Sequence, residues 1–369
     1  MSSTGKSNCR YTGAGLKAEI EYNKLLILAQ FKSEPEPKPE PKPKTRTIRQ
    51  AIDSFLARQA ANVNAGAIGA GRYQNCKRYL DHFADFYGPS KSASGIDELC
   101  LEEYGLHILS KTTGDKPWSR AYASMYLKAL RQFVRWAWSL RLIEDLPRNI
   151  DRSEVKITVE TEEVKVWPIA AVQAVMGFIP KRSERLKLYM LLMLNCGMTQ
   201  KDISDLEPDQ VDWQAHTITR KRSKTQDCKN VPTVTYPLWD STFALLEKYG
   251  NKTGELVLTN RRGSPLKVIR LMGKKVVNVD IIGTMYGKFR KRCQEAGVLT
   301  DSPTLKMFRK TSHSLIGNAP NDTWATYKVY FLGHAPMTVA DKHYFKLDQA
   351  EFAKAIQWLG ETLGVCSQP

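Results

Sequence analysis

Apolar residues recur at helical spacing in two stretches of the first half of the chain, residues 73–83 and 122–140. Their positions are Tyr73, Cys76, Leu80 and Phe83 in the first stretch, and Tyr122, Tyr126, Leu130, Phe133, Ala137 and Leu140 in the second. Steps of three and four residues put such side chains on one face of a helix. Gly88, followed by proline, ends the first helix, and Ser119 is suited to cap the second. The pattern predicts helices through residues 47–150.

The second half of the chain mixes helical and strand-like patterns. Residues 169–179 and the strongly apolar residues 183–195 have helical spacing, and Gly197 marks a break after them. Short stretches with the alternation typical of strands are 211–213, 216–219 and 231–236. Residues 242–364 return to a mainly helical pattern. We therefore predict an α+β fold that is mainly α and contains a small antiparallel sheet.

Composition shifts divide the chain into parts. Prolines alternate with charged residues over residues 33–45, which excludes helix and sheet and favours an extended spacer. Before it, residues 16–31 have a helix-like pattern, either an extra DNA or partner contact or a weakly ordered tail. The predicted parts are an arm with a proline-rich linker (1–46), a helical domain (47–150), a charged interdomain linker (151–165) and a C-terminal domain (166–369).

The charge balance changes this picture by indicating a partner. The chain has 55 Lys and Arg against 38 Asp and Glu, a net charge of +17. Such an excess favours a polyanionic partner, although a solvated basic surface remains the alternative. Lys128, Arg131 and Arg135 share one side of the predicted helix 122–140, away from its apolar stripe. This basic ridge is interpreted as a contact to double-stranded DNA or as a solvated face.

Cysteine usage and hydropathy exclude several classes of protein. The seven cysteines are scattered and form no C-x-x-C pair, so we expect reduced thiols, no disulfide framework and no zinc knuckle. The histidines also lack the i, i+4 spacing of a metal site. The longest apolar run, residues 188–194, is too short to span a bilayer, and the N-terminus has no signal-peptide pattern. We expect a cytoplasmic protein without a metal or other cofactor.

Three separated stretches carry the residues best suited to phosphate chemistry. They are residues 195–206 with the basic turn 220–225 that follows, residues 305–315, and residues 331–344. In this order and separation they resemble the C-terminal catalytic domain of the tyrosine recombinases, the phage integrase family, over residues 166–363. The preceding helical region is similar to the SAM-like core-binding domain of that family. The most specific piece is Leu-Gly-His at 332–334 with Tyr344 ten residues after the histidine.

The resemblance implies a reaction and a set of residues. Members of the family cleave one DNA strand with a tyrosine, form a 3′-phosphotyrosine and rejoin the strand to another, without metal or nucleotide. Such a site needs a nucleophile, cations around the phosphate oxygens and an acid for the leaving 5′-oxygen. By resemblance the catalytic residues are Tyr344 as the nucleophile, Arg309 and His334 on the phosphate, Lys224 as the acid, and Lys306.

Two positions differ from the family pattern. Lys306 stands where most members have histidine, and a lysine has a higher pKa and shuttles protons less well at neutral pH. Thr199 stands at the position of the first family arginine, although the acidic residue three positions later is kept as Asp202. Because threonine cannot neutralise a phosphate, we expect chemistry slowed by about 10²–10³-fold or more. One hypothesis is that Lys201 compensates by reaching into the site.

Other basic residues complete the predicted DNA surface. The predicted DNA contacts are Lys128, Arg131, Arg135, Lys201, Arg220, Arg222 and Lys310. His313 and His343 are interpreted as structural. A catalytically silent relative that binds DNA without cutting it stays open because of Thr199, as does a type IB topoisomerase-like activity. Residues 198–206 also resemble the first helix of a helix-turn-helix regulator, but strand-like residues follow instead of a recognition helix.

The last predicted helix, residues 348–363, has an apolar stripe. Its members are Phe352, Ile356, Leu359 and Leu363. This stripe either folds back on its own domain or docks on a neighbouring protomer, as C-terminal segments of such recombinases often do. We expect a homo-oligomer assembled on DNA through this helix.

Overall fold

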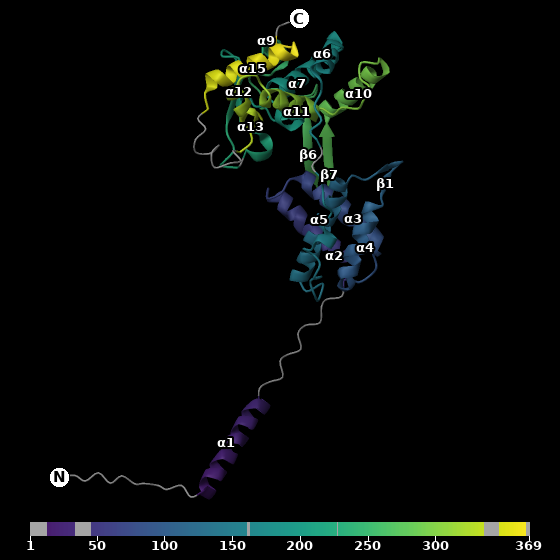
Figure 1. Cartoon of the computed structure of the whole chain (residues 1–369), viewed down its shortest axis with the longest axis vertical. Helices are drawn as coiled ribbons and strands as arrows, with labels where there is room; N and C mark the ends of the chain where they lie inside the picture. Colours follow the sequence, from purple (N-terminus) through teal and green to yellow (C-terminus); the bar gives the residue numbers. More distant parts are fainter. Residues whose placement is uncertain (1–12, 34–45, 161–162, 227, 336–346, 367–369) are drawn as a thin grey trace, which may run out of the picture. The chain divides into compact units, whose positions relative to one another are not determined.

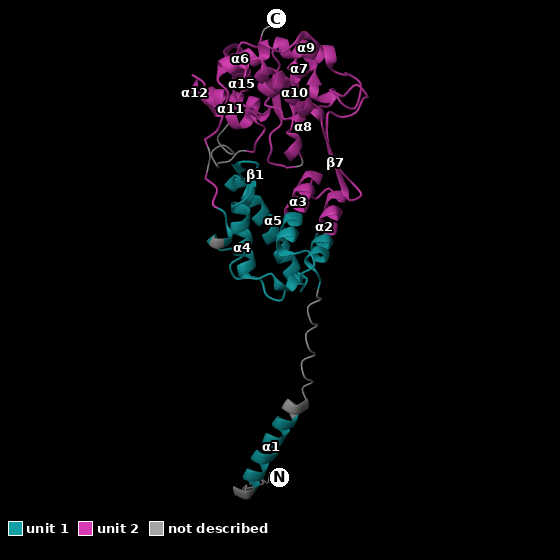
Figure 2. Cartoon of the chain, turned by 90° about the vertical axis from the view of Figure 1, so that its right-hand side faces the viewer, with its two compact units in different colours: residues 1–55, 80–157 teal, residues 56–79, 158–369 magenta. Residues whose placement is uncertain are grey.

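The chain is analysed as a computed structural model that describes residues 13–33, 46–160, 163–226, 228–335 and 347–366. Contacts divide it into two compact units. The first comprises residues 1–55 and 80–157, and the second comprises residues 56–79 and 158–369. Figure 2 shows that the division passes through two helices, α2 and α3. The last boundary between the units, after Ile157, falls within the segment expected to be a linker.

The N-terminal part is helical, as its apolar pattern predicts. Its helices are α1 (Gly13–Ser33), α2 (Ile48–Asn64), α3 (Ala70–Tyr87), α4 (Glu98–Leu109) and α5 (Arg120–Ser139). The Ser119 hydroxyl accepts a hydrogen bond from the Tyr122 amide at 3.2 Å, so the predicted cap is confirmed. Between α4 and α5, two-residue strands β1 (Thr112–Thr113) and β2 (Lys116–Pro117) form a short hairpin that the helical pattern did not indicate.

The core of the first unit is aromatic. The α5 stripe is buried from Tyr126 to Ala137, whereas Leu140 at its end is exposed. Phe133 packs edge-on against Phe55 of α2, with ring centroids 5.7 Å apart. Tyr104 of α4 is fully buried. Burial of this stripe, more than helix propensity, holds α5 in place.

Helix α7 (Glu184–Asn195) is the centre of the second unit. Its residues 188–195 are all buried, and it contacts the helices around it. Figure 1 shows α12, α13 and α15 on one side of α7 and α11, and α10 on the other. These helices are α6 (Ile169–Gly177), α8 (Gln200–Ser204), α9 (Asp240–Tyr249), α10 (Ile281–Glu295), α11 (Lys306–Gly317), α12 (Asp322–Thr326), α13 (Lys328–Phe331) and α15 (Gln349–Leu363). The helices expected at 169–179 and 183–195 are therefore confirmed. Among the described helices, none is both long enough and apolar enough to cross a bilayer.

The predicted antiparallel sheet is also confirmed. Strands β3 (Val211–Asp212), β4 (Thr217–Arg220) and β5 (Val234–Pro237) lie in the order β3-β4-β5. Ile218 pairs with both Val211 and Tyr236, and all three side chains are buried. Since α8 has only five residues and a strand follows it, this segment is not a helix-turn-helix.

The helical pattern of residues 242–364 missed one element of the second unit. Helices predominate there as predicted, but strands β6 (Lys267–Met272) and β7 (Lys275–Asp280) form a hairpin among them. Gly273 makes the turn with φ of +58°, a conformation that glycine adopts without strain. Val276, Val277 and Val279 favour a strand because branching at Cβ disfavours helix. Arg270 and Asn278 interrupt the apolar runs of the two strands and hid this signal in the sequence.

The C-terminal helix α15 packs into its own domain. Phe352, Ile356, Leu359 and Leu363 are all buried in the core of the second unit. The Trp239 indole donates a hydrogen bond to the Ile356 carbonyl at 2.8 Å. In this structure the apolar stripe is occupied within the chain, so it is not the surface that α15 presents to a second copy.

We predict that Phe352→Ala destabilises the second unit by about 3–5 kcal/mol, because it leaves a cavity in a close-packed core. Met272→Ala serves as the control, since Met272 lies at the end of β6 and is 54% exposed. It should change stability by less than about 0.5 kcal/mol. Urea unfolding followed by tryptophan fluorescence measures both, and equal effects of the two variants would contradict this packing of α15.

Candidate functional site

Arg309 joins three separate segments of the second unit. It lies on α11 and is 8% exposed. Its Nη1 donates to the Gly197 carbonyl after α7, and its Nη2 donates to the Leu332 carbonyl after α13 at 2.9 Å. Nη2 also lies 3.4 Å from Nε2 of His334. A guanidinium has five N–H donors, and these contacts use three, so two remain for a ligand.

Gly197 allows this close approach. Its φ is +56°, in the left-handed region that side chains other than glycine rarely adopt. A Cβ atom here would lie 2.9 Å from Cε1 of Phe331, closer than atoms pack. The break that the sequence shows after α7 therefore turns a backbone carbonyl towards Arg309.

His334 is presented by a turn at the end of α13. Gly333 has φ of +58°, and its amide donates to the Tyr330 carbonyl at 2.7 Å. Burial, followed by the charges of Arg222 and Arg309, lowers the pKa of His334 to about 4. The ring is therefore neutral at pH 7. Because a guanidinium only donates, Nε2 is the acceptor towards Arg309 and the ring proton lies on Nδ1.

Two more cations come from the turn after β4. Arg222 precedes the 3-10 turn Ser223–Thr225, which carries Lys224 with an exposed side chain. A Cβ atom on Gly333 would lie 3.5 Å from Cβ of Arg222, so the base of the Arg222 side chain lies beside the Gly333 turn that presents His334. Burial and then the Arg222 charge lower the pKa of Arg309 to about 10. We call Arg222, Lys224, Arg309 and His334 the cation cluster.

A buried ion pair supports the cluster from behind. Nη2 of Arg220 lies 2.5 Å from Oδ1 of Asp202, and the two side chains are 5% and 1% exposed. Burial raises the Asp202 pKa, but Arg220 and the Thr199 hydrogen bonds outweigh it and bring the pKa to about 2. Arg220 was expected to contact DNA; instead, its guanidinium lies inside the domain because Asp202 needs a buried counter-charge.

Thr199 has a structural role here. Its backbone amide and its hydroxyl each donate to Oδ2 of Asp202 at 2.8 Å, and the two residues form a capping box that opens α8. Lys201 is exposed on the same short helix, and its ammonium binds Asp205 at 2.6 Å. The lysine proposed to compensate for Thr199 is thus bound to a surface carboxylate.

The other candidates differ in how far the structure places them. Lys306 is exposed on the first turn of α11, three residues before Arg309 and on the same helix face, and Lys310 is half-buried. Tyr344 and His343 lie outside the described residues, which stop at Ala335 and resume at Leu347. The structure thus brings together four of the predicted site residues and does not describe the proposed nucleophile.

His313 is a neighbour that sequence reasoning left as structural. It is half-buried one turn after Arg309, and burial, Lys328 and Arg309 lower its pKa. His313 also contributes to lowering the pKa of His334, so the two rings interact electrostatically. Its i, i+4 spacing from Arg309 was the available signal.

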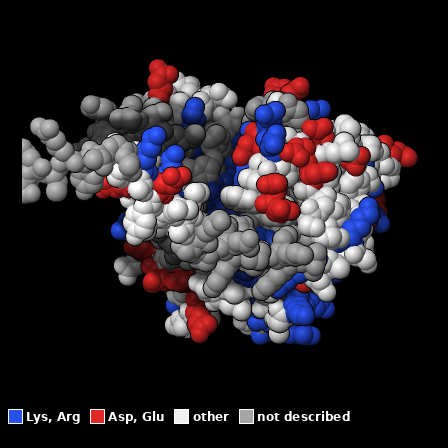
Figure 3. All heavy atoms as spheres, turned by 90° about the horizontal axis from the view of Figure 1, so that it is seen from below, with Lys and Arg blue, Asp and Glu red and all other residues white. Residues whose placement is uncertain are grey.

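The basic ridge of α5 is partly neutralised within the first unit. Arg131 and Arg135 both donate to Oδ1 of Asp151, with an Arg131 distance of 2.5 Å. Lys128 is exposed. Figure 3 shows one face of the molecule, on which Lys and Arg form several groups with acidic side chains between them. The positive charge is therefore distributed rather than confined to this ridge.

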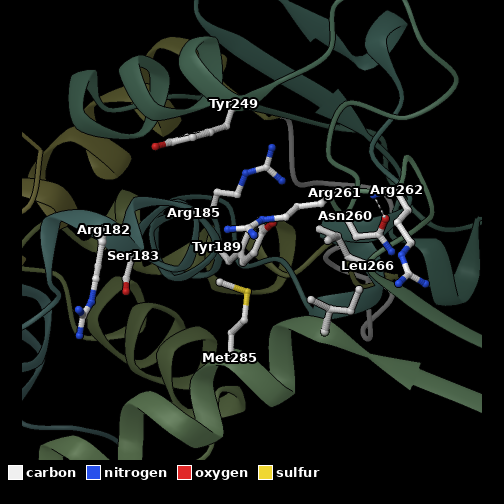
Figure 4. A pocket seen from close by; sticks show the side chains of 11 residues that line it. Arg182, Ser183, Arg185, Tyr189, Tyr249, Asn260, Arg261, Arg262, Leu266 and Met285 are labelled. Atoms are coloured by element: carbon white, nitrogen blue, oxygen red, sulfur yellow. Dashed lines mark hydrogen bonds between the residues drawn. The ribbon is translucent and has the colours of Figure 1, made fainter.

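A second basic feature of this unit is a cavity of about 650 Å³. Arg182, Arg185, Arg261 and Arg262 line it together with Tyr189, Tyr249 and Met285, and no acidic residue is among the described lining residues. Figure 4 shows Arg185 between Arg182 and Arg262, beside Tyr249. Arg185 donates to the Thr259 carbonyl at 2.9 Å and stacks on the Tyr249 ring. None of the cation cluster residues lines this cavity.

Comparison with solved structures assigns the fold. The chain has a tyrosine recombinase fold. It is similar to the Tn1549 transposon integrase in complex with transposon right end DNA, with a TM-score of 0.58 and 13% identity over 87% of this chain and 100% of that chain. A lambda integrase dimer bound to a COC′ core site gives a TM-score of 0.57 and 17% identity over 91% and 88% of the two chains. A lambda integrase tetramer bound to a Holliday junction gives 0.57 and 17% over 92% and 91%. No protein-family model and no curated protein sequence matches the chain.

We predict that Asp202→Asn destabilises the second unit by about 3 kcal/mol or more, because it leaves the buried Arg220 charge unpaired. Asp205→Asn is the matched control on the same helix; it removes only the exposed contact to Lys201 and should cost less than about 0.5 kcal/mol. Chemical unfolding measures both. Similar losses for the two variants would contradict a buried ion pair.

The same carboxylate gives a pH dependence. Because the folded-state pKa of Asp202 is about 2, below the ordinary value, its stabilisation is present above about pH 4 and is lost as the pH falls towards 2. This contribution amounts to about 2–3 kcal/mol. The stability difference between wild type and Asp202→Asn, measured by urea unfolding from pH 7 to pH 3, should therefore shrink only below about pH 4. A difference that does not change with pH would refute this assignment.

Proposed function

We propose that this protein is a DNA-breaking and rejoining recombinase that acts through a 3′-phosphotyrosine on Tyr344. The observation that carries the proposal is the cation cluster: Nη2 of Arg309 lies 3.4 Å from Nε2 of His334, and Arg222 packs against the Gly333 turn that presents this histidine. Cations gathered around a histidine suit an anion whose charge is spread over several oxygens. The tyrosine recombinase fold supports a phosphodiester as that anion.

In the proposed reaction the Tyr344 oxygen attacks the scissile phosphorus while its proton passes to a water molecule. The bond from phosphorus to the 5′-oxygen breaks, and the 3′-phosphate stays on the tyrosine. The two free N–H donors of Arg309 bind non-bridging oxygens, and their orientation is set beforehand by the Gly197 and Leu332 carbonyls. His334 donates from Nδ1, because Nε2 accepts from Arg309.

Two lysines have proposed roles at the ends of the reaction. Lys224 is exposed on its turn, so its ammonium is free to reach the leaving 5′-oxygen and protonate it. Lys306 supplies charge from the first turn of α11 in the position where the family has histidine. Attack by a 5′-hydroxyl of another strand reverses the steps and rejoins the DNA.

We further propose that several copies assemble on double-stranded DNA. The net charge of +17 favours affinity from phosphate contacts, and therefore a steep dependence on salt. Lambda integrase has been solved as a dimer bound to a COC′ core site and as a tetramer bound to a Holliday junction, which supports assembly. Because the apolar stripe of α15 is buried in its own domain, a contact between copies through this helix must use its outer face.

The test is covalent capture on DNA. Duplexes that bind the full chain are selected from a random-sequence pool, nicked near their centres, and incubated with the protein. We expect a protein–DNA adduct that survives denaturation, because the nick lets the short cleaved strand diffuse away. Tyr344→Phe should abolish the adduct and leave binding unchanged.

Tyr330→Phe is the control for loss of a phenol in the same part of the chain, and it should keep the adduct. The Tyr330 hydroxyl donates to the Thr233 carbonyl at 3.2 Å and makes no hydrogen bond with the described residues of the cation cluster. Selective binding with no adduct from the wild type would overturn the recombinase proposal and identify a silent DNA-binding relative.

A further inference from the structure

We propose that Arg222 replaces the arginine that this chain lacks at position 199, and that its guanidinium binds a non-bridging oxygen of the scissile phosphate beside Arg309. This inference rests on the proposed function and names a further residue that binds the phosphate in it. Arg222 was expected from the sequence only as a general DNA contact. The structure places its backbone against the turn that presents His334.

Position 199 is not available for phosphate binding. The Thr199 amide and hydroxyl both bind Asp202, and this capping box fixes the start of α8. Asp202 in turn takes its positive partner from β4, as Arg220 at 2.5 Å. The Asp202 carboxylate, which could pair with an arginine at position 199, is therefore already paired with Arg220 of β4.

The Arg222 guanidinium has hydrogen-bonding capacity that the described residues do not satisfy. Its Nε is buried and has no hydrogen-bond partner among the described residues. Within the described ranges, no ion pair involves this guanidinium. A buried donor without a partner is unfavourable, and an incoming oxygen would satisfy it. Arg222 thus combines a buried Nε that lacks a partner with a backbone position next to Gly333.

Electrostatics connect Arg222 to the rest of the cluster. Among charged neighbours, Arg222 has the largest effect on both Arg309 and His334, and it lowers both pKa values. Two guanidinium groups this close repel each other when no anion is present. A phosphate oxygen between them turns repulsion into attraction, which is the pattern expected of a preorganised anion site.

The other nearby cations are engaged elsewhere. Arg220 is paired with Asp202, and Lys201 with Asp205. Lys221 and Arg220 line a small cavity that also contains Asp205 and Glu207. Among the described basic residues of this turn, Arg222 is thus the arginine associated with Arg309 and His334.

The first experiment uses inorganic phosphate as the probe and does not depend on catalysis. The His334 ring signal of the full chain, assigned by comparison with His334→Gln, is followed by NMR during titrations with phosphate and with acid. In the wild type we expect a saturable shift on adding phosphate. A signal at His334 also excludes phosphate bound only in the arginine-lined cavity.

Arg222→Met should weaken the phosphate effect at His334 by about tenfold or more, because a charge-assisted hydrogen bond is lost. In the absence of phosphate, the same variant should raise the pKa of His334 from about 4 towards its ordinary value, since a repelling charge is gone. Lys221→Met is the matched control, with the same loss of charge one residue away, and should change neither quantity. Unchanged phosphate binding and an unchanged pKa in Arg222→Met would overturn the inference.

The second experiment is the rate of adduct formation on the nicked duplex. We expect Arg222→Met to slow it by about 10²–10³-fold, Arg222→Lys to retain part of it, and Lys221→Met to match the wild type. Circular dichroism and thermal melting confirm that each variant is folded.

The two experiments separate the possible failures. If folded Arg222→Met forms the adduct as fast as the wild type, the proposed role of Arg222 is refuted and the recombinase proposal is unaffected. A wild type that forms no adduct would sink the recombinase proposal, while the phosphate titration still decides whether Arg222 belongs to the anion site.

Discussion

The burial of the Arg309 guanidinium against two backbone carbonyls is the interaction on which the site depends. It ties the turn after α7 to the turn after α13 through a side chain of α11. A charged group is tolerated there because each carbonyl replaces a hydrogen bond to water. The same contacts fix the plane of the guanidinium. The helical core around α7 and α15 holds these segments in place.

The charges around this arginine are divided between support and function. Asp202 and Arg220 neutralise each other out of contact with solvent, so their pair stabilises the scaffold and adds little net field. Within the described residues no ion pair involves Arg222, Lys224 or Arg309, and burial, followed by the charges of Arg222 and Arg309, keeps His334 neutral. Excess positive charge at one place, next to a neutral hydrogen-bonding ring, is what a phosphate site requires.

The departure at Thr199 also becomes intelligible in these terms. In this chain the acidic residue of the motif is kept, but its arginine partner comes from β4, two residues before Arg222. Residues two apart on an extended strand would point to the same side, but β4 ends at Arg220, so Arg222 lies beyond the strand, at the start of the turn Ser223–Thr225. One arginine of this basic segment serves Asp202 while the other lies at the Gly333 turn.

The sequence by itself determined the helices with a clear apolar stripe, such as α5, α7 and α15, and the small sheet, because their periods of burial are visible without knowing what covers them. It also indicated Arg309, His334 and Lys224, through motifs of fixed order. It did not reveal the β6–β7 hairpin, whose partly exposed strands are interrupted by Arg270 and Asn278. Only the tertiary structure decided which basic residue does what. Arg220 and Arg222 are alike in sequence, and their different roles arise from Asp202 on one side and Gly333 on the other, contacts between segments far apart in the chain.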